Sequence, residues 1–255
     1  MDLLNETMRA LAFLSRLPVS SRWFRDYDGA LASSVRGFPL AGIIIALPAA
    51  LVLLVTWSLP AFASALLVTA VLVVTTGALH EDGLADVADG FYGGNSPQRR
   101  LEIMKDSAIG SYGTLALIFS VLLRTALLAT VIGEVGSLQA LAVLIGTEAA
   151  SRAALAKFWQ SLPSARSGGV ADQAGVPTTN AANSALAIGG FVLAVGYGFA
   201  AGVLAVIAAG ALATLAYFGF AALCRAKIGG QTGDTLGALQ QFVSISLLLG
   251  LVIVL

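Results

Sequence analysis

Charged residues, cysteine and histidine are all scarce in this chain of 255 residues. Lys, Arg, Asp and Glu make up 11% of it, against about 25% in ordinary soluble domains, which argues against a soluble protein. The single cysteine, Cys224, excludes an internal disulfide and fits a packed thiol. The basic and acidic residues cancel to a net charge of zero, so nothing points to a nucleic-acid partner.

Hydrophobic residues are abundant instead, at 58% of the chain. The mean hydropathy of +0.89 is that of a membrane protein. We predict an all-α, polytopic integral membrane helix bundle with about seven transmembrane helices, in a range of six to eight, because seven apolar runs come near the length of about 20 residues that crosses a bilayer. The predicted spans are 38–58, 61–79, 113–133, 138–157, 184–201, 202–222 and 236–254, with a tight turn between the fifth and the sixth around Ala200 to Gly202.

The chain is expected to form a single membrane-embedded domain, residues 1–255. Its first part, 1–36, is too polar for a signal peptide. Leucines such as Leu3 and Leu11 fit a helix that lies in the membrane interface on the cytoplasmic side. Residues 37–255 then form the transmembrane bundle.

The basic residues predict which side of the membrane each connection lies on. Thirteen of the fourteen Lys and Arg residues fall in alternate connections, within 9–36, 99–105, 152–166 and 225–227. Basic residues concentrate on the cytoplasmic side of membrane proteins. We therefore expect a cytoplasmic N-terminus, and a cytoplasmic location for the connection at 80–90.

Arg124 is the exception, about midway along the third predicted span, and Glu148 lies at a similar depth in the fourth. An unpaired charge at that depth costs at least ~2.5 kcal/mol. Two interpretations stay open. Either the two side chains form an ion pair, or each reaches separately into a polar cavity on the cytoplasmic side.

An acidic cluster lies in the segment HEDGLADVADG, residues 80–90, which contains no Lys or Arg. If the preceding span continues into it as a helix, Asp82, Asp86 and Asp89 share one face, with Glu81 at the edge. Carboxylates this close repel one another and need a counter-charge. We predict a divalent-cation site formed by Glu81, Asp82, Asp86 and Asp89, and the alternative is a solvated helix end.

The ligand type indicates the metal. Oxygen ligands without thiolate suit Mg²⁺ or Mn²⁺ and not Zn²⁺, and His80 beside the cluster fits a neighbouring residue better than a ligand. Mg²⁺ takes few carboxylates and fills its shell with water and substrate phosphate. The cluster therefore predicts Mg²⁺ and a phosphorylated substrate.

Three further polar segments on the same predicted side contain glycine next to charge, and such loops are candidate phosphate cradles. They are 99–113 with Arg100, Lys105 and Asp106; 164–175 with Arg166 near Gly168 and Gly169; and 225–238 with Gly229, Gly230 and Asp234. Because all of these segments belong to one face, we expect a single catalytic mouth that opens to the cytoplasm.

Three motifs carry a family resemblance. TGALHEDGLADVADGFYGG at 76–94, RRLEIMKDSAIGSYGTLAL at 99–117 and GGQTGDTLGAL at 229–239 closely resemble the cobalamin synthase family, the adenosylcobinamide-GDP ribazoletransferases. The resemblance runs from near residue 10 to near residue 240. One departure is visible after the third motif, where many family members carry a glutamate and this chain has Gln240 and Gln241.

The resemblance implies an Mg²⁺-dependent membrane enzyme of nucleotide-loop assembly, late in cobalamin biosynthesis, in the inner membrane of a bacterium. Its substrates would be the corrinoid nucleotide adenosylcobinamide-GDP and α-ribazole or its 5′-phosphate. The products would be adenosylcobalamin, or its 5′-phosphate, and GMP. Besides the lipid bilayer no other partner is indicated, and a homo-oligomer is left open.

The implied mechanism assigns roles to the candidate residues. Asp82, Asp86 and Asp89, with Glu81 adjacent, hold one or two Mg²⁺ ions against the pyrophosphate. A free carboxylate of the cluster, or Asp106 or Asp234, takes the proton of the attacking hydroxyl. Arg100, Lys105 and Arg166 bind phosphate, with Arg16 further off.

Two alternatives to this function are weighed. A CDP-alcohol phosphotransferase acting on a lipid headgroup would share the metal chemistry, although the chain lacks the full spaced signature of that class. A secondary transporter would place its acids near the middle of the bilayer, where this chain has only Glu148 clearly inside a span.

Overall fold

The computed structural model describes residues 2–25, 27, 29–166, 168 and 174–255. Among these residues the structure is helical, with one isolated β-bridge between Ser164 and Gln231. The helices are α1 (Leu3–Leu14), η1 (Ser21–Phe24), η2 (Leu31–Gly37), α2 (Phe38–Val55), α3 (Ala61–Thr76), α4 (Leu79–Gly93), α5 (Pro97–Ile103), α6 (Ser111–Val135), α7 (Ser137–Ser161), α9 (Thr179–Ile228) and α10 (Gly233–Val252). The predicted all-α membrane bundle is confirmed.

The number of helices able to span a membrane is lower than the seven predicted. Four helical stretches of the described residues are long and apolar enough, or five if α3 and α4 count as one bent span; the four are Leu31–Val55, Ser111–Val135, Thr179–Ile228 and Gly233–Val252. Two of the differences have physical causes, because α3 has only 16 residues and α7 contains Glu148 and Arg152. The third is a matter of counting, since Thr179–Ile228 is taken as one stretch although it holds two predicted spans.

The chain bends sharply between α3 and α4, so the continuous helix expected past Thr76 does not form. Gly77 and Ala78 both adopt left-handed backbone conformations, with φ of 65° and 57°, and the two helices lie at 88° to each other. Glycine takes this conformation at little cost, whereas at Ala78 it is rare for a residue with a side chain. Because α4 restarts immediately, its acids keep their helical spacing. Four of its 15 residues are acidic, and we treat it as a polar helix that follows α3.

Helix α9 breaks where the sequence predicts a turn. Gly202 has φ of 80° and ψ of −173°, outside the helical region, and divides the 50 residues of α9 into two halves. A backbone conformation of this kind is essentially restricted to glycine. The break makes α9 a pair of helices packed on α7 and α10.

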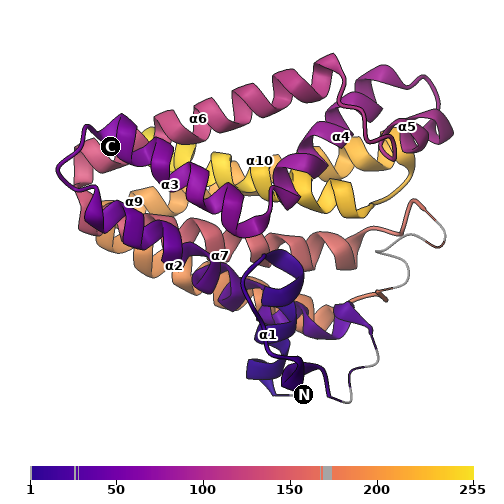
Figure 1. The fold of residues 1–255 in the computed structure, drawn as a ribbon, viewed down its shortest axis with the longest axis horizontal. Helices are drawn as coiled ribbons and strands as arrows, with labels where there is room; N and C mark the ends of the chain where they lie inside the picture. The colour runs from indigo at the N-terminus through magenta and orange to yellow at the C-terminus, as the bar shows by residue number, and fades with distance from the viewer. Residues whose placement is uncertain (1, 26, 28, 167, 169–173) are drawn as a thin grey trace.

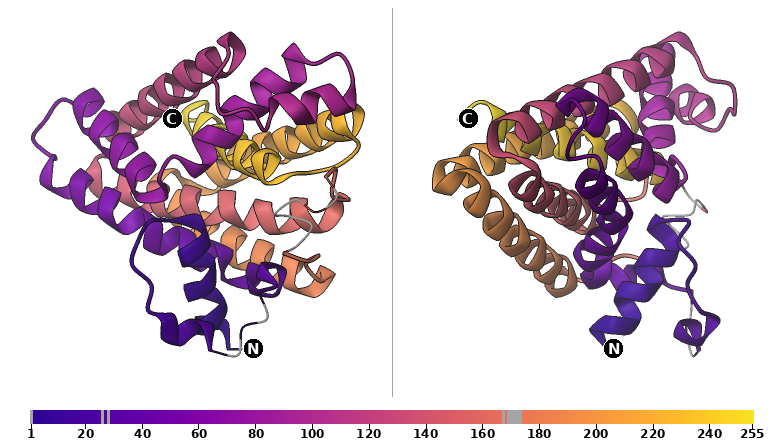
Figure 2. Two further views of the ribbon diagram at one scale, coloured as in Figure 1. Left: turned by 45° about the vertical axis from the view of Figure 1, so that its right-hand side comes forward. Right: turned by 60° about the vertical axis from the view of Figure 1, so that its left-hand side comes forward.

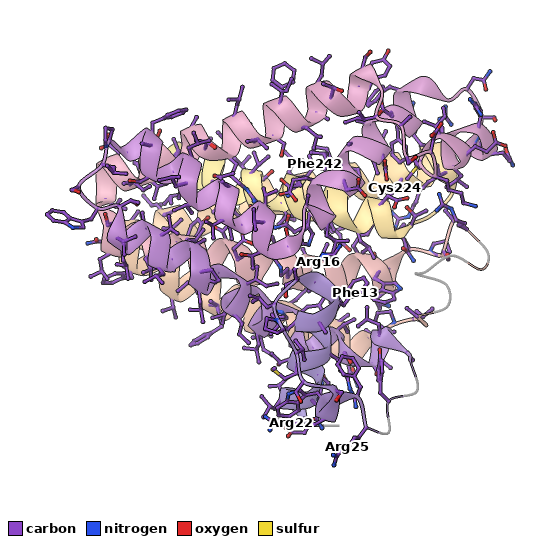
Figure 3. The ribbon with its side chains drawn as sticks, in the orientation of Figure 1. Phe13, Arg16, Arg22, Arg25, Cys224 and Phe242 are labelled. Atoms are coloured by element: carbon purple, nitrogen blue, oxygen red, sulfur yellow. The ribbon has the colours of Figure 1, made fainter. Side chains whose placement is uncertain are left out.

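The N-terminal segment and the α4–α5 corner lie on different sides of the bundle (Figures 1 and 2). Arg16 lies where α1 meets the bundle, whereas Arg22 and Arg25 lie at the outer end of the N-terminal segment (Figure 3). The backbone N–H of Arg16 donates to the carbonyl of Thr75 at 2.8 Å. Helix α1 is thereby attached at the bend that leads into α4.

Candidate active site

Three carboxylates from two helices define the candidate site. Asp82 is exposed and Asp86 half-buried on α4, and Asp234 lies in the first turn of α10. The two helices approach closely because Gly83 has no side chain. A Cβ atom there would lie 2.6 Å from the backbone oxygen of Asp234. Gly237 on α10 contributes to the same close approach from the other side, since a Cβ atom there would lie 3.4 Å from the Cα of Gly83 on α4.

The charges of this group are unbalanced. Burial first, and then repulsion by Asp82, Asp234 and Asp89, raise the pKa of Asp86 to about 7, while Arg166 opposes the shift. The pKa of a carboxyl rises in this way when nearby positive charge is insufficient. The predicted need for a counter-charge is therefore visible in the structure.

Asp89 is engaged with the start of α6. One of its carboxylate oxygens accepts the backbone N–H of Gly110 at 2.7 Å, and the other accepts that of Gly113 at 2.9 Å. The first N–H groups of a helix have no partner within the helix, and a carboxylate placed there also interacts favourably with the helix dipole. Asp89 thus fixes α6 against α4, on the same face as Asp82 and Asp86.

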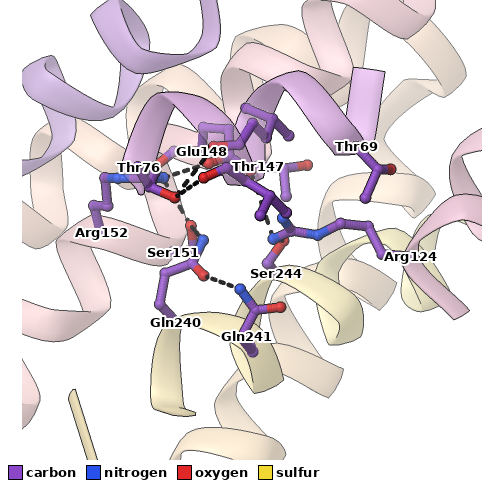
Figure 4. A network of polar contacts seen from close by, with 12 residues as sticks. Thr69, Thr76, Arg124, Thr147, Glu148, Ser151, Arg152, Gln240, Gln241 and Ser244 are labelled. Atoms are coloured by element: carbon purple, nitrogen blue, oxygen red, sulfur yellow. Dashed lines mark hydrogen bonds and ion pairs between the residues drawn. The ribbon is translucent and has the colours of Figure 1, made fainter. Parts of the chain in front are cut away.

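Glu81 points into the bundle and away from solvent. It is buried, and its Oε1 accepts a hydrogen bond of 2.9 Å from Gln241 Nε2 on α10. Gln241 also accepts from Ser120 and donates to Gln240, which in turn donates to Ser151. This buried polar network joins α4 to α6, α7 and α10, and Figure 4 shows its part around Ser151, Gln240 and Gln241.

Arg124 and Glu148 form the ion pair that one of the two sequence interpretations expects. Arg124 Nη2 lies 3.7 Å from Glu148 Oε1, and both side chains are buried. Arg152 also pairs with Glu148, within α7. Arg152 was predicted in a cytoplasmic connection, which is wrong, because it is buried one helical turn from the carboxylate that compensates it.

The predicted phosphate-binding side chains lie around the same corner of the molecule. Arg166 Nη2 is 3.9 Å from Asp234 Oδ2 and donates to the carbonyl of Leu101. Arg100 donates to the carbonyl of Lys227 at 2.9 Å, and its Nε is buried with no partner within the described part of the chain. Both arginines thus connect segments that are far apart in the sequence.

Lys105 and Asp106 are exposed in the loop between α5 and α6. Asp106 accepts the N–H of Ala108 at 3.1 Å, within its own loop. Asp106 is not among the charges that act on Asp86, whereas Asp234 is. The structure therefore associates Asp234 with the acids of α4 more closely than Asp106.

The predicted glycine cradle at 229–230 has visible structural roles. Gly229 ends α9 with φ of 79°, and a Cβ atom at Gly230 would lie 2.2 Å from the carbonyl oxygen of Pro163. The segment at 163–165 is held beside 230–231, since Gln231 N–H donates to Pro163 and Ala165 N–H donates to Gln231. In the other predicted cradle, Gly169 lies outside the described residues.

No group of three or more His, Cys, Asp or Glu side chains of the described residues is arranged to hold a metal ion. Asp82 and Asp86 remain one helical turn apart, with Asp86 under repulsion from Asp82 and Asp234. Two carboxylates are the protein share that Mg²⁺ commonly takes when substrate phosphate completes its shell. The assignment of metal ligands stays a prediction.

Sequence reasoning missed the buried partners of the site. Gln240 and Gln241 were noted only as a departure from the resembling family, and neither Ser151 nor Ser244 was given a role. Ser244 accepts from Arg124 at 2.6 Å. The available signal was spacing, because Gln240 and Gln241 place two amides in a predicted span, about two turns after Asp234.

Fold and site together define a class: an integral membrane helix bundle with an acidic, glycine-packed site at one end. The family model described as "Cobalamin-5-phosphate synthase" matches residues 6–252, nearly the whole chain. The chain belongs to this family.

Curated relatives agree. A protein of Brucella ovis is 49% identical over 255 residues, covering 99% of this chain and 98% of its own length, and is named adenosylcobinamide-GDP ribazoletransferase. Proteins of Brucella canis and Brucella abortus, with the same identity and coverage, have the same name. No solved structure matches the chain.

Proposed function

We propose that this chain is an adenosylcobinamide-GDP ribazoletransferase that acts in cobalamin biosynthesis. The observation that carries the proposal is the family match over residues 6–252. It favours this function over a CDP-alcohol phosphotransferase or a transporter. The reaction joins adenosylcobinamide-GDP to α-ribazole, or to its 5′-phosphate, and releases GMP.

Atoms balance in this reaction as a displacement at phosphorus. A ribose hydroxyl of ribazole other than the 5′-hydroxyl, which is blocked in the 5′-phosphate form, bonds through its oxygen to the phosphorus attached to cobinamide. The bond from that phosphorus to the bridging oxygen breaks, GMP leaves with this oxygen, and the hydroxyl proton goes to a base. Such transfers depend mainly on positioning and on electrostatic stabilisation of phosphoryl oxygens.

Asp82 and Asp86 fit a divalent cation best. Asp82 is exposed, and the raised pKa of Asp86 reflects burial and unneutralised carboxylates. Mg²⁺ bound there would neutralise charge on the pyrophosphate as GMP departs. Glu81 and Asp89, predicted as further ligands, already accept hydrogen bonds from Gln241, Gly110 and Gly113. We assign these two to positioning α4 relative to α6 and α10.

Asp234 is the preferred general base and Asp106 the second candidate. Asp234 faces α4 across the Gly83 contact, and Arg166 lies 3.9 Å from it. A positioned base contributes about 10²- to 10⁴-fold to a rate. Arg166, with Arg100 and Lys105, supplies positive charge for substrate phosphates.

The site is proposed to face the cytoplasm of a bacterial cell from the inner membrane. Basic residues gather in the segments around the site: Arg99, Arg100 and Lys105 in and just after α5, Arg166 after α7, and Arg225 and Lys227 at the end of α9. An excess of Lys and Arg on one side of a membrane protein marks the cytoplasmic side. The orientation is tested with a reporter fused at 94–96 and a label added to intact cells from outside. A cytoplasmic site predicts that the reporter stays unlabelled.

The activity is tested with membranes that contain the chain. Adenosylcobinamide-GDP and α-ribazole with Mg²⁺ should yield GMP and the joined corrinoid, and excess EDTA should abolish both products. CDP-diacylglycerol with an alcohol acceptor serves as the control pair and should yield no product. Product from the control pair alone would contradict the proposal.

A further inference from the structure

Helix α9 and its neighbours enclose an apolar groove that the proposed reaction does not use. It has a volume of about 480 Å³ and lies between the two halves of α9, over a floor formed by α7 and α10. Ligand sites commonly measure about 300–1,000 Å³. The walls are made largely by small residues, such as Ala153, Gly190 and Gly210.

The groove follows one stripe of the second half of α9. Gly210, Ala213, Tyr217, Ala221 and Arg225 all line it, at the i, i+3, i+4 spacing that puts residues on one helix face. From Gly210 to Arg225 the stripe is about 22 Å long at the helical rise of about 1.5 Å per residue. One leaflet contributes about 15 Å of hydrocarbon, so the groove is long enough for an acyl chain.

The groove ends at a polar mouth with two cations. Lys157 and Arg225 line this end with Ser161 and Tyr217, whose hydroxyl groups are 3.0 Å apart. Lys157 Nζ donates to two neutral oxygens, those of Gln160 and Asn183. Within the described ranges, neither Lys157 nor Arg225 forms an ion pair with an acid, so two positive charges face the mouth without an acidic partner.

The mouth lies at the same end of the bundle as the candidate site. Ser161 lies two residues before Pro163, whose carbonyl accepts from the backbone N–H of Gln231. Arg225 lies a short way before Gln231 in the chain, so both ends of this junction reach the mouth. In the proposed topology this is the cytoplasmic leaflet, which carries anionic lipid. Basic pockets between transmembrane helices on that side bind anionic lipid headgroups.

We propose that this groove binds one anionic phospholipid, with an acyl chain between the halves of α9 and its phosphate at Lys157 and Arg225. Helix α9 fits this role because Leu186 and Phe218, which line the groove from its two halves, are exposed, so the groove opens toward lipid. The charge at the mouth selects an anionic headgroup over a zwitterionic one. The bound lipid fills space that the small residues of α7 and α9 leave open.

Glycine positions allow a direct test. A Cβ atom at Gly210 or Gly219 would meet no heavy atom within 4 Å, so Gly210→Leu and Gly219→Leu both fit the fold. Gly210 lines the groove, whereas Gly219 lies on the opposite face of the same helix and does not. Gly219→Leu is therefore the matched control, and Gly190→Leu is a second blocking variant from the other half of α9.

The measurement is native mass spectrometry of the full chain in detergent, titrated with dioleoylphosphatidylglycerol or dioleoylphosphatidylcholine. We expect one tightly retained phosphatidylglycerol per chain, preferred at least about tenfold over phosphatidylcholine. Gly210→Leu and Gly190→Leu should lower this retention at least about tenfold, and Gly219→Leu should not. The double variant Lys157→Gln/Arg225→Gln should lose the preference for the anionic lipid.

Four results would overturn the proposal. The first two are equal retention by the Gly210→Leu and Gly219→Leu variants and equal retention of the two lipids by the unmodified chain. The third is displacement of the lipid by excess GMP, which would assign the cations to a soluble phosphate. The fourth is a dimer that Gly210→Leu dissociates, because a second copy of the chain would then fill the groove. None of these readouts depends on the transferase activity.

Discussion

Glu81 on α4 accepts a hydrogen bond of 2.9 Å from Gln241 on α10, although the two residues are 160 positions apart. Both side chains are buried. The bond ties the helix that carries the candidate metal ligands to the helix that carries Asp234. It also gives Gln241 a defined partner inside the bundle.

Gln241→Leu is expected to destabilise the protein and lower its activity through the loss of the buried hydrogen bond to Glu81. Glu81 would lose its partner while remaining buried, at a cost of about 1–3 kcal/mol or more for a charged group. We expect a lower thermal unfolding midpoint in detergent, together with reduced transferase activity. Gln98→Leu, at an exposed position on α5, is the control and should leave both unchanged. Equal behaviour of the two variants would show that the bond contributes nothing.

Glu148→Gln tests the buried ion group. Glu148 pairs with both Arg124 and Arg152, so its loss leaves two buried cations without a counter-charge. Breaking a buried pair costs about 3–5 kcal/mol, and we expect a loss of that order in unfolding free energy. Glu134→Gln, near the exposed end of α6, should stay within about 0.5 kcal/mol of the original chain. A stable Glu148→Gln protein would mean that solvent reaches the arginines.

Gly83→Ala tests the close approach of α4 and α10. The added methyl group would lie 2.6 Å from the backbone oxygen of Asp234, so one helix must move. Displacements near 1 Å cost an active site on the order of a hundredfold in rate, and we expect a loss of that size. Gly233→Ala meets nothing within 4 Å and should retain activity. An active Gly83→Ala enzyme would show that catalysis does not depend on the close contact between α4 and α10.

Asp89→Ala distinguishes two roles for that residue. Loss of the hydrogen bonds to Gly110 and Gly113 should cost about 1–2 kcal/mol of stability, as for other helix N-terminal caps. If Asp89 only holds α6 in place, the Mg²⁺ concentration that gives half-maximal activity should not change. A large shift in that concentration would instead make Asp89 a metal ligand, as the sequence predicts.

Local features of the fold followed from the sequence, because they depend on neighbouring residues. The break near Gly202 lies where an apolar run is too long for one span, and the spacing of Asp82, Asp86 and Asp89 survives because α4 is helical. The bend before α4 could not be foreseen. Ala78 adopts a left-handed conformation that its own side chain disfavours, and tertiary contacts must enforce it.

Long-range partners were harder to predict. Arg152 lies near the end of an apolar run and resembles a residue of a connection, yet Glu148 one turn away keeps it inside the bundle. Asp234 could be placed near α4 from the sequence, because all the polar segments on one face were expected to line a single catalytic mouth. Pairing Gln241 with Glu81 required the packing of α4 on α10, which depends on Gly83 and Gly237 and is not encoded by any local spacing.

Asp82→Asn is the most direct test of the central claim, that carboxylates on α4 hold the cation that activates the nucleotide substrate. The measurement is the rate of GMP release from adenosylcobinamide-GDP and α-ribazole by membranes with matched protein content, across a Mg²⁺ titration. Glu102→Gln, which removes an exposed acid of α5, should retain the original rate. We expect Asp82→Asn to lose at least about a hundredfold, a barrier increase of about 2.7 kcal/mol. A rate equal to that of Glu102→Gln at every Mg²⁺ concentration would contradict the account.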